Sequence, residues 1–159
     1  MATLIGSGGH ADDIHATLNG WRRIHHHSVW DGDPTVIIGI NDPHIRAKAA
    51  ADLGIEDLSW VHPDANLYGG MEIGHGTHIN YGVMMTRTRI GTHTTIAPGV
   101  HCAGDVAIGS RVFVGIGATI SNFVTIGDDA IIGAGAVLPP NTIVPVGETW
   151  VGNPARRLR

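Results

Sequence analysis

The stretch IGSRVFVGIGATISNFVTIGDDAIIG, residues 108–133, carries an aliphatic side chain at every sixth position. A small or β-branched residue follows each of these side chains four positions later. A short period that recurs in one register is typical of a solenoid, in which every turn covers the next. The alternative is a β-sandwich with short strands, but strands of a sandwich do not hold one register for about 80 residues.

The same register extends in both directions from this stretch. It slips once, because one residue is missing between Ile79 and Ile90, so that either Met84 or Met85 fills the position. Three hexapeptides, each a strand plus a corner, make a coil of about 18 residues, and such coils stack at the ordinary strand spacing. Glycine directly after the aliphatic residue suits a sharp bend. The pattern predicts a three-sided parallel β-helix over residues 61–149.

Composition narrows the class of protein. The 159 residues are 43% apolar with a net charge of −4, which argues against disorder, and the 23 glycines are far too few for collagen. Ten lysines and arginines are too few for a face that binds nucleic acid. No apolar run is long enough to span a membrane, the first residues lack the pattern of a signal peptide, and Cys102 is the only cysteine. We therefore expect a cytoplasmic protein.

Residues 1–60 have a different pattern, in which short strands and helices alternate. The apolar runs at 3–6 and 35–39 predict strands, and residues 11–19 predict a helix after a glycine turn. This order predicts a small parallel sheet. About 60 residues make a thin core, so we expect this half to pack against the β-helix.

The strongest local signals in this half surround a second expected helix. Asn41 and Asp42 are good N-terminal caps, and Pro43 suits the first turn of a helix. Gly54 suits the left-handed residue that ends one. We expect the helix to lie between these residues.

Three segments of the chain, taken with the repeat, carry a family resemblance. They are Ile5-Gly-Ser-Gly-Gly-His-Ala11, Thr35-Val-Ile-Ile-Gly-Ile-Asn41 with Ile45-Arg46, and Val61-His-Pro-Asp-Ala65. The chain resembles the hexapeptide-repeat sugar acyltransferases of the sialic acid O-acetyltransferase and bacillosamine N-acetyltransferase group. The resemblance implies a mainly β fold, a left-handed parallel β-helix preceded by a small, truncated α/β Rossmann-like domain.

The same resemblance implies a domain organisation and an activity. Residues 1–60 would bind a sugar or nucleotide sugar, 61–149 would be the acyltransferase β-helix, and 150–159 would lie near the coenzyme. The implied reaction transfers an acyl group from acetyl-CoA to an amino or hydroxyl group of the sugar, in a homotrimer and without a metal. The chain is shorter than the family norm around residues 20–34, a stretch that in the family helps to hold the sugar nucleotide, and its β-helix lacks about one early coil.

The expected catalytic base is missing from its usual place. The resemblance implies a histidine in a hexapeptide of the form Ile-x-His-Asp-Cys-x before the next Ile-Gly. In the matching stretch, 84–91, Thr86 stands at that position, or Arg87 if the gap is moved. Neither side chain is a general base at neutral pH. An acceptor amine that sheds its proton after attack, without an enzymic base, is one way around this loss.

A different histidine could also serve as the base in place of the missing one. His93 is the best candidate base, because it lies near the turn that carries Arg87 and Arg89. His75 is expected on the same face one coil earlier, and His78 and His101 are expected at corners. A lone histidine on a β-helix is more often a plain polar surface residue.

The rest of the implied site is present. Cys102-Ala-Gly-Asp105 is similar to the family's Cys-Ala-Gly-Asn, which implies that the Gly104 N–H helps to form an oxyanion hole. Equal spacings, each of three hexapeptides, place Thr86, Gly104 and Asn122 in one column of successive coils. The implied coenzyme contacts are Gly104, Asn122, Gly115, Gly117, Gly133, Gly135, Gly152 and Pro154. The implied sugar contacts are Gly8, Gly9, His10, Asp31 and Asp33. Glycines at such positions of a β-helix are more often required by corner geometry alone.

Two other functions remain open on the sequence alone. The chain could be a catalytically silent binding or assembly protein that kept the scaffold and lost the base. Several histidines on a β-helix also suggest a γ-class carbonic anhydrase, in which three histidines bind zinc. That family needs a Gly-His followed five residues later by a second histidine, whereas Gly74-His75 is followed by His78.

Overall fold

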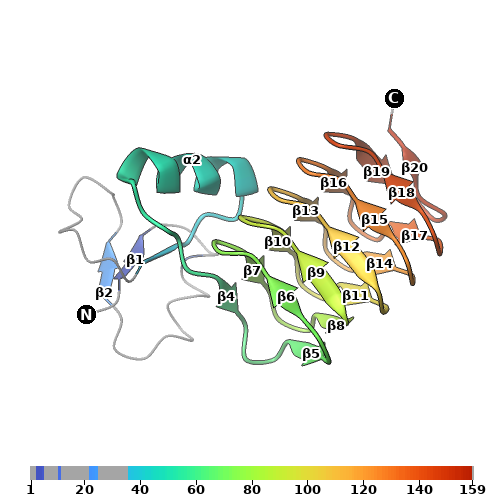
Figure 1. The fold of residues 1–159 in the computed structure, drawn as a ribbon, viewed down its shortest axis with the longest axis horizontal. Helices are drawn as coiled ribbons and strands as arrows, with labels where there is room; N and C mark the ends of the chain where they lie inside the picture. The colour runs from blue at the N-terminus through green and yellow to red at the C-terminus, as the bar shows by residue number, and fades with distance from the viewer. Residues whose placement is uncertain (1–2, 6–10, 12–21, 25–35, 159) are drawn as a thin grey trace.

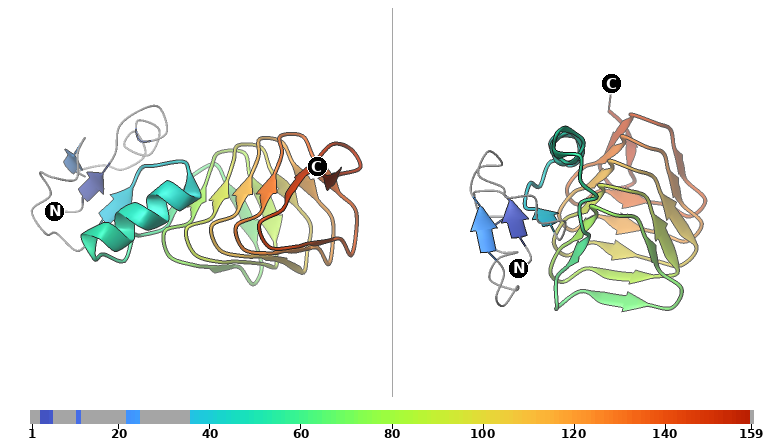
Figure 2. Two further views of the ribbon diagram at one scale, coloured as in Figure 1. Left: turned by 90° about the horizontal axis from the view of Figure 1, so that it is seen from above. Right: turned by 60° about the vertical axis from the view of Figure 1, so that its left-hand side comes forward.

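The protein is a solenoid of short strands with a smaller α/β unit at its N-terminal end (Figure 1). Viewed toward its N-terminal end, the solenoid is built of three-sided coils (Figure 2). The predicted three-sided parallel β-helix is therefore confirmed. The computed structural model describes residues 3–5, 11, 22–24 and 36–158.

Each side of the solenoid is one sheet, and the chain visits the three sheets in turn. Sheet 1 contains, in spatial order, β20 (Arg156–Arg157), β19 (Thr149–Val151), β16 (Ile131–Ile132), β13 (Phe113–Val114), β10 (Thr95–Ile96), β7 (His78–Ile79) and β4 (Trp60–Val61). Sheet 2 contains β17 (Val137–Leu138), β14 (Thr119–Ile120), β11 (His101–Cys102), β8 (Met84–Thr86) and β5 (Asn66–Tyr68). Sheet 3 contains β18 (Ile143–Val144), β15 (Thr125–Ile126), β12 (Val106–Ile108), β9 (Thr88–Ile90) and β6 (Glu72–Ile73). All pairs are parallel except β19 with β20.

The aliphatic ladder forms the core on the axis of the solenoid. Its members are at most 5% exposed from the second coil onward: Ile79, Met85, Ile90, Ile96, Cys102, Ile108, Val114, Ile120, Ile126, Ile132, Leu138 and Val144. The slipped position is filled by Met85, which is fully buried, whereas Met84 is 48% exposed. Full burial of one such side chain contributes about 1.5–3 kcal/mol, so the ladder is the main stabilising element of the solenoid.

The chain turns at three corners, and each corner has its own left-handed residues. The glycine corner has only glycine there: Gly82, Gly99, Gly117 and Gly135. The groove corner, which includes residues 86–87, 103–105, 121–123 and 139–141, has Arg87, Asp105, Phe123 and Asn141. The α2 corner, which includes residues 74–76, 91–94, 109–112 and 127–130, has Gly76, His93, Arg111 and Asp129. Left-handed backbone is uncommon outside glycine, so the repeat imposes this conformation on whatever residue occupies the position.

The N-terminal unit contains the small parallel sheet that the sequence predicts. Its order is β2 (Arg22–Ile24), β1 (Thr3–Ile5) and β3 (Val36–Ile38), and β2 was not expected. The helix predicted at 11–19 lies outside the described residues except for Ala11.

Helix α2 (Pro43–Leu53) follows β3 and lies along the α2 corner of the solenoid (Figures 1 and 2). Its caps are those predicted. The Asp42 side chain accepts hydrogen bonds from the His44 and Ile45 N–H groups at 2.9 and 3.0 Å, and Gly54 is left-handed with φ 65°. Within the described ranges, no helix combines the length and the apolar character that crossing a bilayer requires.

Candidate functional site

An open groove of about 520 Å³ runs along the outer face of sheet 2 and reaches the groove corner. It brings together two residues that the sequence placed in the site, Thr86 and Asn122, with outward-facing residues of β8, β11 and β14. Its lining is Tyr68, Met84, Met85, Thr86, His101, Cys102, Ala103, Thr119, Ile120, Ser121, Asn122 and Pro140. The volume is in the range of small-molecule sites.

The missing residue of the repeat lies at the groove corner. Met85 pairs with Cys102 and Thr88 pairs with Val106, so the chain between the two pairs is shorter in the earlier coil than in the later one. In this shorter coil, Arg87 occupies the position that Gly104 and Asp105 share in the next coil. The backbone of Arg87 is left-handed, with φ of 41°, as is that of Asp105. The Arg87 carbonyl accepts from the Asp105 N–H at 3.0 Å, in the same way as the Gly104 carbonyl accepts from the Phe123 N–H of the following coil.

The Arg87 side chain lies over the next coil. Its guanidinium forms an ion pair with Asp105, with Nη2–Oδ2 at 3.1 Å and Nε–Oδ1 at 3.3 Å. Hydrogen bonding from Arg87 lowers the pKa of the Asp105 carboxyl. The same guanidinium covers Gly104, where an added Cβ would lie only 3.0 Å from the Arg87 Cζ. The sequence pattern predicts that Thr86 stacks against Gly104, but the side chain that covers Gly104 is that of Arg87.

Gly104 has the features of a backbone donor to an anionic atom. The residue is buried, and its N–H donates no hydrogen bond to another described residue. Its carbonyl accepts from the Phe123 N–H at 3.3 Å and from Asn122 Nδ2 at 3.4 Å. The predicted stacking of Asn122 on Gly104 is therefore present. An unpaired N–H held by rigid backbone is suited to stabilise an oxyanion.

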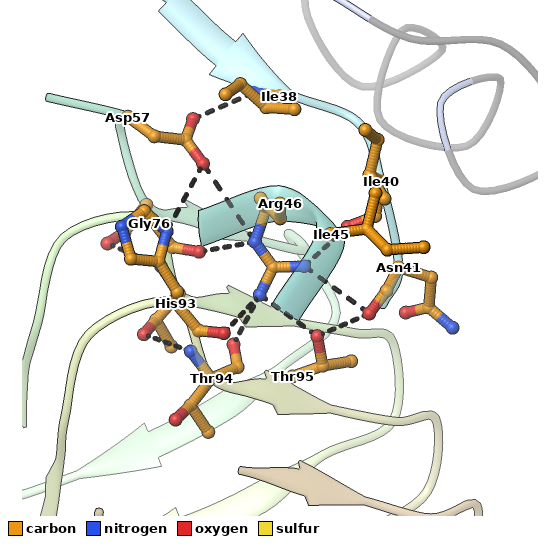
Figure 3. Close-up of polar contacts among 12 residues, drawn as sticks. Ile38, Ile40, Asn41, Ile45, Arg46, Asp57, Gly76, His93, Thr94 and Thr95 are labelled. Carbon is orange, nitrogen blue, oxygen red and sulfur yellow. Dashed lines mark hydrogen bonds and ion pairs between the residues drawn. The ribbon is translucent and has the colours of Figure 1, made fainter. Parts of the chain in front are cut away.

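His93 lies at the α2 corner, in a different part of the solenoid from Thr86 and Gly104. Its side chain is 11% exposed and packs edge-on against His75, with ring centroids 5.0 Å apart. Its Nδ1 lies 4.0 Å from Asp57 Oδ2, and neither atom has a hydrogen-bond partner among the described residues (Figure 3). The structure thus does not bring His93 together with the groove, and its assignment as the base stays a prediction.

Arg46 of α2 ties this corner to the N-terminal unit. Its side chain is fully buried, and it donates to the carbonyls of Gly76 at 2.7 Å, His93 at 2.8 Å and Thr94 at 3.1 Å (Figure 3). Asp57 accepts from the Ile38 N–H at 2.7 Å and lies 3.9 Å from Arg46 Nε. These bonds connect β3, α2 and two coils of the solenoid.

Burial shifts the pKa values of Asp57, His93 and Arg46 toward their neutral forms. Loss of solvent raises the pKa of the Asp57 carboxyl to about 7, with the Ile38 N–H and Arg46 opposing the shift. Loss of solvent, with His75 and Arg46, lowers the pKa of the His93 imidazole to about 4. The pKa of Arg46 falls to about 10, which leaves it charged at neutral pH. His93 is therefore a weak proton acceptor.

The glycines predicted to contact a coenzyme fall into two groups at the glycine corner. A Cβ on Gly115 would lie 2.6 Å from the Ala134 nitrogen, and one on Gly133 would lie 2.8 Å from Val151 Cγ1, so close packing of coils requires both glycines. Gly117 and Gly135 have φ of 66° and 64° with open space around them. Corner geometry accounts for all four, and their contact with a coenzyme stays a prediction.

The C-terminal segment turns back onto the last coils. Gly152 has φ 93°, and its carbonyl accepts from the Val137 N–H at 3.0 Å. After Pro154, the buried Ala155 donates to the Val137 carbonyl at 2.8 Å. The segment is therefore fixed beside sheet 2, on which the groove lies.

The predicted sugar contacts lie outside the described residues, so the structure places none of them. They are Gly8, Gly9, His10, Asp31 and Asp33. Within residues 36–158 and the shorter described segments, no three His, Cys, Asp or Glu side chains converge as metal ligands.

Sequence reasoning misplaced one residue of the groove. His101 and His78 were expected at corners, but both lie in strands, β11 and β7. His101 is exposed and lines the groove beside Thr86. Strand register could have found it, because the residue before each aliphatic anchor faces outward.

Comparison with known proteins agrees with this architecture. Residues 105–140 match the family model described as bacterial transferase hexapeptide (six repeats), which confirms the repeat that the sequence indicated. No curated protein sequence matches the chain.

Solved structures match over almost the full length. A mutant of perosamine N-acetyltransferase from Caulobacter crescentus, in complex with CoA and GDP-perosamine, has a TM-score of 0.81 and 24% identity, covering 99% of this chain and 96% of that one. WeeI from Acinetobacter baumannii AYE has a TM-score of 0.77 and 22% identity, covering 99% of both chains. The acetyltransferase domain of PglB from Neisseria gonorrhoeae FA1090 has a TM-score of 0.76 and 21% identity, covering 99% and 98%. These matches establish the fold as the predicted left-handed β-helix with an N-terminal extension.

Proposed function

We propose that the protein transfers an acyl group, acetyl in the first instance, from acyl-CoA to an amino group of a sugar or nucleotide sugar. An acceptor hydroxyl is the alternative nucleophile. The observation that carries the proposal is a likeness that extends over 99% of the chain, N-terminal unit included, to a perosamine N-acetyltransferase with CoA and GDP-perosamine bound. The groove beside Gly104 supports it, because it offers a site of suitable volume.

The chemistry of the proposed reaction assigns a role to the groove corner. The acceptor nitrogen attacks the thioester carbonyl carbon, and the carbonyl oxygen gains negative charge. The unpaired Gly104 N–H would stabilise this oxyanion, with the Arg87 guanidinium beside it. Collapse of the intermediate breaks the C–S bond, CoA leaves as the thiolate, and the nitrogen loses one proton. Asn122 and the glycine corner are proposed to contact the coenzyme, and so are Gly152 and Pro154.

The proposal includes a homotrimer in the cytoplasm. Large apolar side chains lie exposed along the outer surface of the solenoid, among them Ile116 at 62%, Phe123 at 59% and Ile143 at 69%. Exposed apolar side chains in such numbers support a surface covered by other subunits. We expect sedimentation to give a mass three times that of the chain. Residues 1–60 are proposed to hold the sugar.

The proposal is tested by measuring CoA release from acetyl-CoA with a panel of amino sugars and their nucleotide derivatives. A Thr119→Trp variant places a large side chain in the groove on β14, and we expect it to abolish turnover and weaken acetyl-CoA binding. Thr125→Trp is the matched control, because Thr125 is likewise the exposed first residue of a Thr-Ile strand, β15 of sheet 3. Its activity should stay within about threefold of wild type.

Two outcomes would overturn the proposal. Absence of acetyl-CoA binding would exclude an acyltransferase. Binding without turnover of any acceptor would favour the silent binding protein. This alternative has a structural basis, because the Arg87 side chain covers Gly104. Metal analysis is the further check, because one zinc per chain would favour the carbonic anhydrase.

A further inference from the structure

The proposed acyl transfer needs a proton acceptor, and the groove corner offers a poor one. The Asp105 carboxylate is paired with Arg87, whose hydrogen bonds lower its pKa and make it a weak base. Thr86 is a hydroxyl, and the Arg87 guanidinium is held charged by Asp105. His93 lies buried at the α2 corner beside Asp57 and Arg46. The missing base must therefore come from another face of the groove, or the reaction must proceed without one.

His101 faces the groove from the middle of sheet 2. It is the first residue of β11, and the register places it between Met84 of β8 and Thr119 of β14. Because residues alternate along a strand, its neighbour Cys102 points to the core and His101 points outward. Both flanking residues and Thr86 line the same groove.

The His101 side chain is free to react. It makes no hydrogen bond or ion pair with another described residue, and it is exposed. Its neighbours on β8 and β14 carry no charge, and the groove lining holds only two other titratable groups, Tyr68 and Cys102. Burial raises the pKa of the Cys102 thiol to about 11, which makes it unreactive at neutral pH. Among the side chains that line the groove, His101 is thus the one with a basic nitrogen.

We propose that His101 is the catalytic base of this site. Resting on the proposed function, the inference assigns one proton path. The imidazole takes a proton from the acceptor nitrogen as that nitrogen bonds to the thioester carbonyl carbon. When the C–S bond breaks, the imidazolium gives the same proton to the departing thiolate, so that amide and free CoA form and His101 is neutral again. The base would thus come from strand β11 rather than from the groove corner.

The first test compares three histidine variants in the CoA-release assay with the intact protein. His101→Gln should lower kcat/KM by about 10²–10⁴-fold with acetyl-CoA binding unchanged, because a positioned base contributes this much. His101→Asn serves as the second variant. His62→Gln, which follows β4 and lies outside both the groove and residues 1–60, is the matched control and should stay at the wild-type rate. The wild-type rate should rise as the pH increases, because a base must be unprotonated to act, and this dependence should vanish in His101→Gln.

The rival assignment is decided in the same assay. Loss of activity in His93→Gln but not in His101→Gln would overturn the inference and return the role to His93. Activity retained in both variants would also overturn it, in favour of an acceptor that needs no base.

A second test does not depend on turnover, so failure of the proposed function and failure of this inference can be told apart. Bromoacetyl-CoA carries an electrophilic carbon next to the thioester carbonyl, and an imidazole nitrogen held there displaces bromide. Peptide mass analysis should find the adduct on His101, and excess CoA should prevent it. An adduct on His101 in a protein without transferase activity would uphold the placement of the residue while the proposed function fails. No adduct, or one on Met84 alone, would overturn the inference.

Discussion

The α2 corner and the groove corner are built by the same repeat, yet one is closed and the other is open. At the α2 corner, helix α2 covers the coils and buries Arg46, Asp57 and His93. At the groove corner no described segment covers the coils, and the ion pair of Arg87 with Asp105 is about half-exposed. The six-residue period therefore sets the backbone of a corner, while the segment that packs across it sets its chemistry.

The two histidines of this comparison show the effect most directly. Burial lowers the pKa of the His93 imidazole to about 4, so that it serves as a neutral packing residue. His101 faces an open groove one sheet away. The same type of residue thus packs against its neighbours at one place and faces an open groove at another.

Removing the Arg46 side chain should open the closed corner. We expect Arg46→Met to lower the free energy of unfolding by about 3–5 kcal/mol, because it leaves buried carbonyls and the Asp57 carboxyl without their partner. Denaturant unfolding measures the loss. Lys48→Met on the exposed face of the same helix is the control, and its change should stay below about 1 kcal/mol. Equal effects of the two variants would mean that Arg46 does not hold the corner.

The pH dependence of the closed corner should appear only when one partner is removed. Between pH 4 and pH 7 the folded pair holds one proton, on Asp57 (pKa about 7), and His93 (pKa about 4) is neutral. The unfolded chain also holds one, on the imidazole, since the ordinary values are 3.8 and 6.5. The two slopes cancel in the wild type.

Single variants should therefore acquire opposite slopes relative to the wild type. In Asp57→Asn the unfolded state binds more protons, so stability should rise as pH increases from 4 to 6.5. In His93→Gln the folded state binds more, so stability should fall as pH increases from 4 to 7. Each slope is at most about 1.4 kcal/mol per pH unit. Unfolding measured across this range would contradict the assignment if both slopes had the same sign.

The same substitution at the two corners should have unequal effects. In Gly91→Ala the new Cβ would lie 2.6 Å from the Ser110 nitrogen, which is backbone of the next coil, and we expect a loss of about 1–3 kcal/mol. In Gly104→Ala the nearest atoms belong to the exposed end of Arg87, which can move away, so the loss should be smaller. Thermal unfolding compares the two, and a larger loss at Gly104 would mean that Arg87 is fixed in place.

The smallest effect should come from the exposed ion pair. Asp105→Asn removes the charge that holds Arg87, and the free energy of unfolding should change by less than about 1 kcal/mol, because both side chains are in solvent. Equilibrium unfolding at low and high salt measures it. A loss of several kcal/mol would mean that the groove corner is as rigid as the α2 corner.

What the sequence could predict was set by local and repeating signals. The aliphatic ladder and the caps of α2 at Asp42 and Gly54 depend on residues close in the chain, and both were found. The sequence pattern does not decide whether Met84 or Met85 fills the slipped position, because both are apolar. Burial in the folded coil decides in favour of Met85.

The candidate site depended on contacts that no period contains. That His93 lies against Asp57 and Arg46 follows from the packing of a helix that comes more than two coils earlier in the chain. That Arg87 rather than Thr86 covers Gly104 follows from which of two residues absorbs the deletion. These are long-range consequences of folding, and single residues in a sequence do not indicate them.

The last strand has a consequence for how the molecule behaves in concentrated solution. A stack of parallel coils ends in unpaired backbone groups, to which another copy could add its own strands and so build a fibre. In sheet 1, β20 pairs antiparallel with β19 and places Arg156 and Arg157, both exposed, along that edge. The reversed direction and the two positive charges make this end a poor template for a further parallel strand, so that on this sheet the solenoid blocks its own polymerisation.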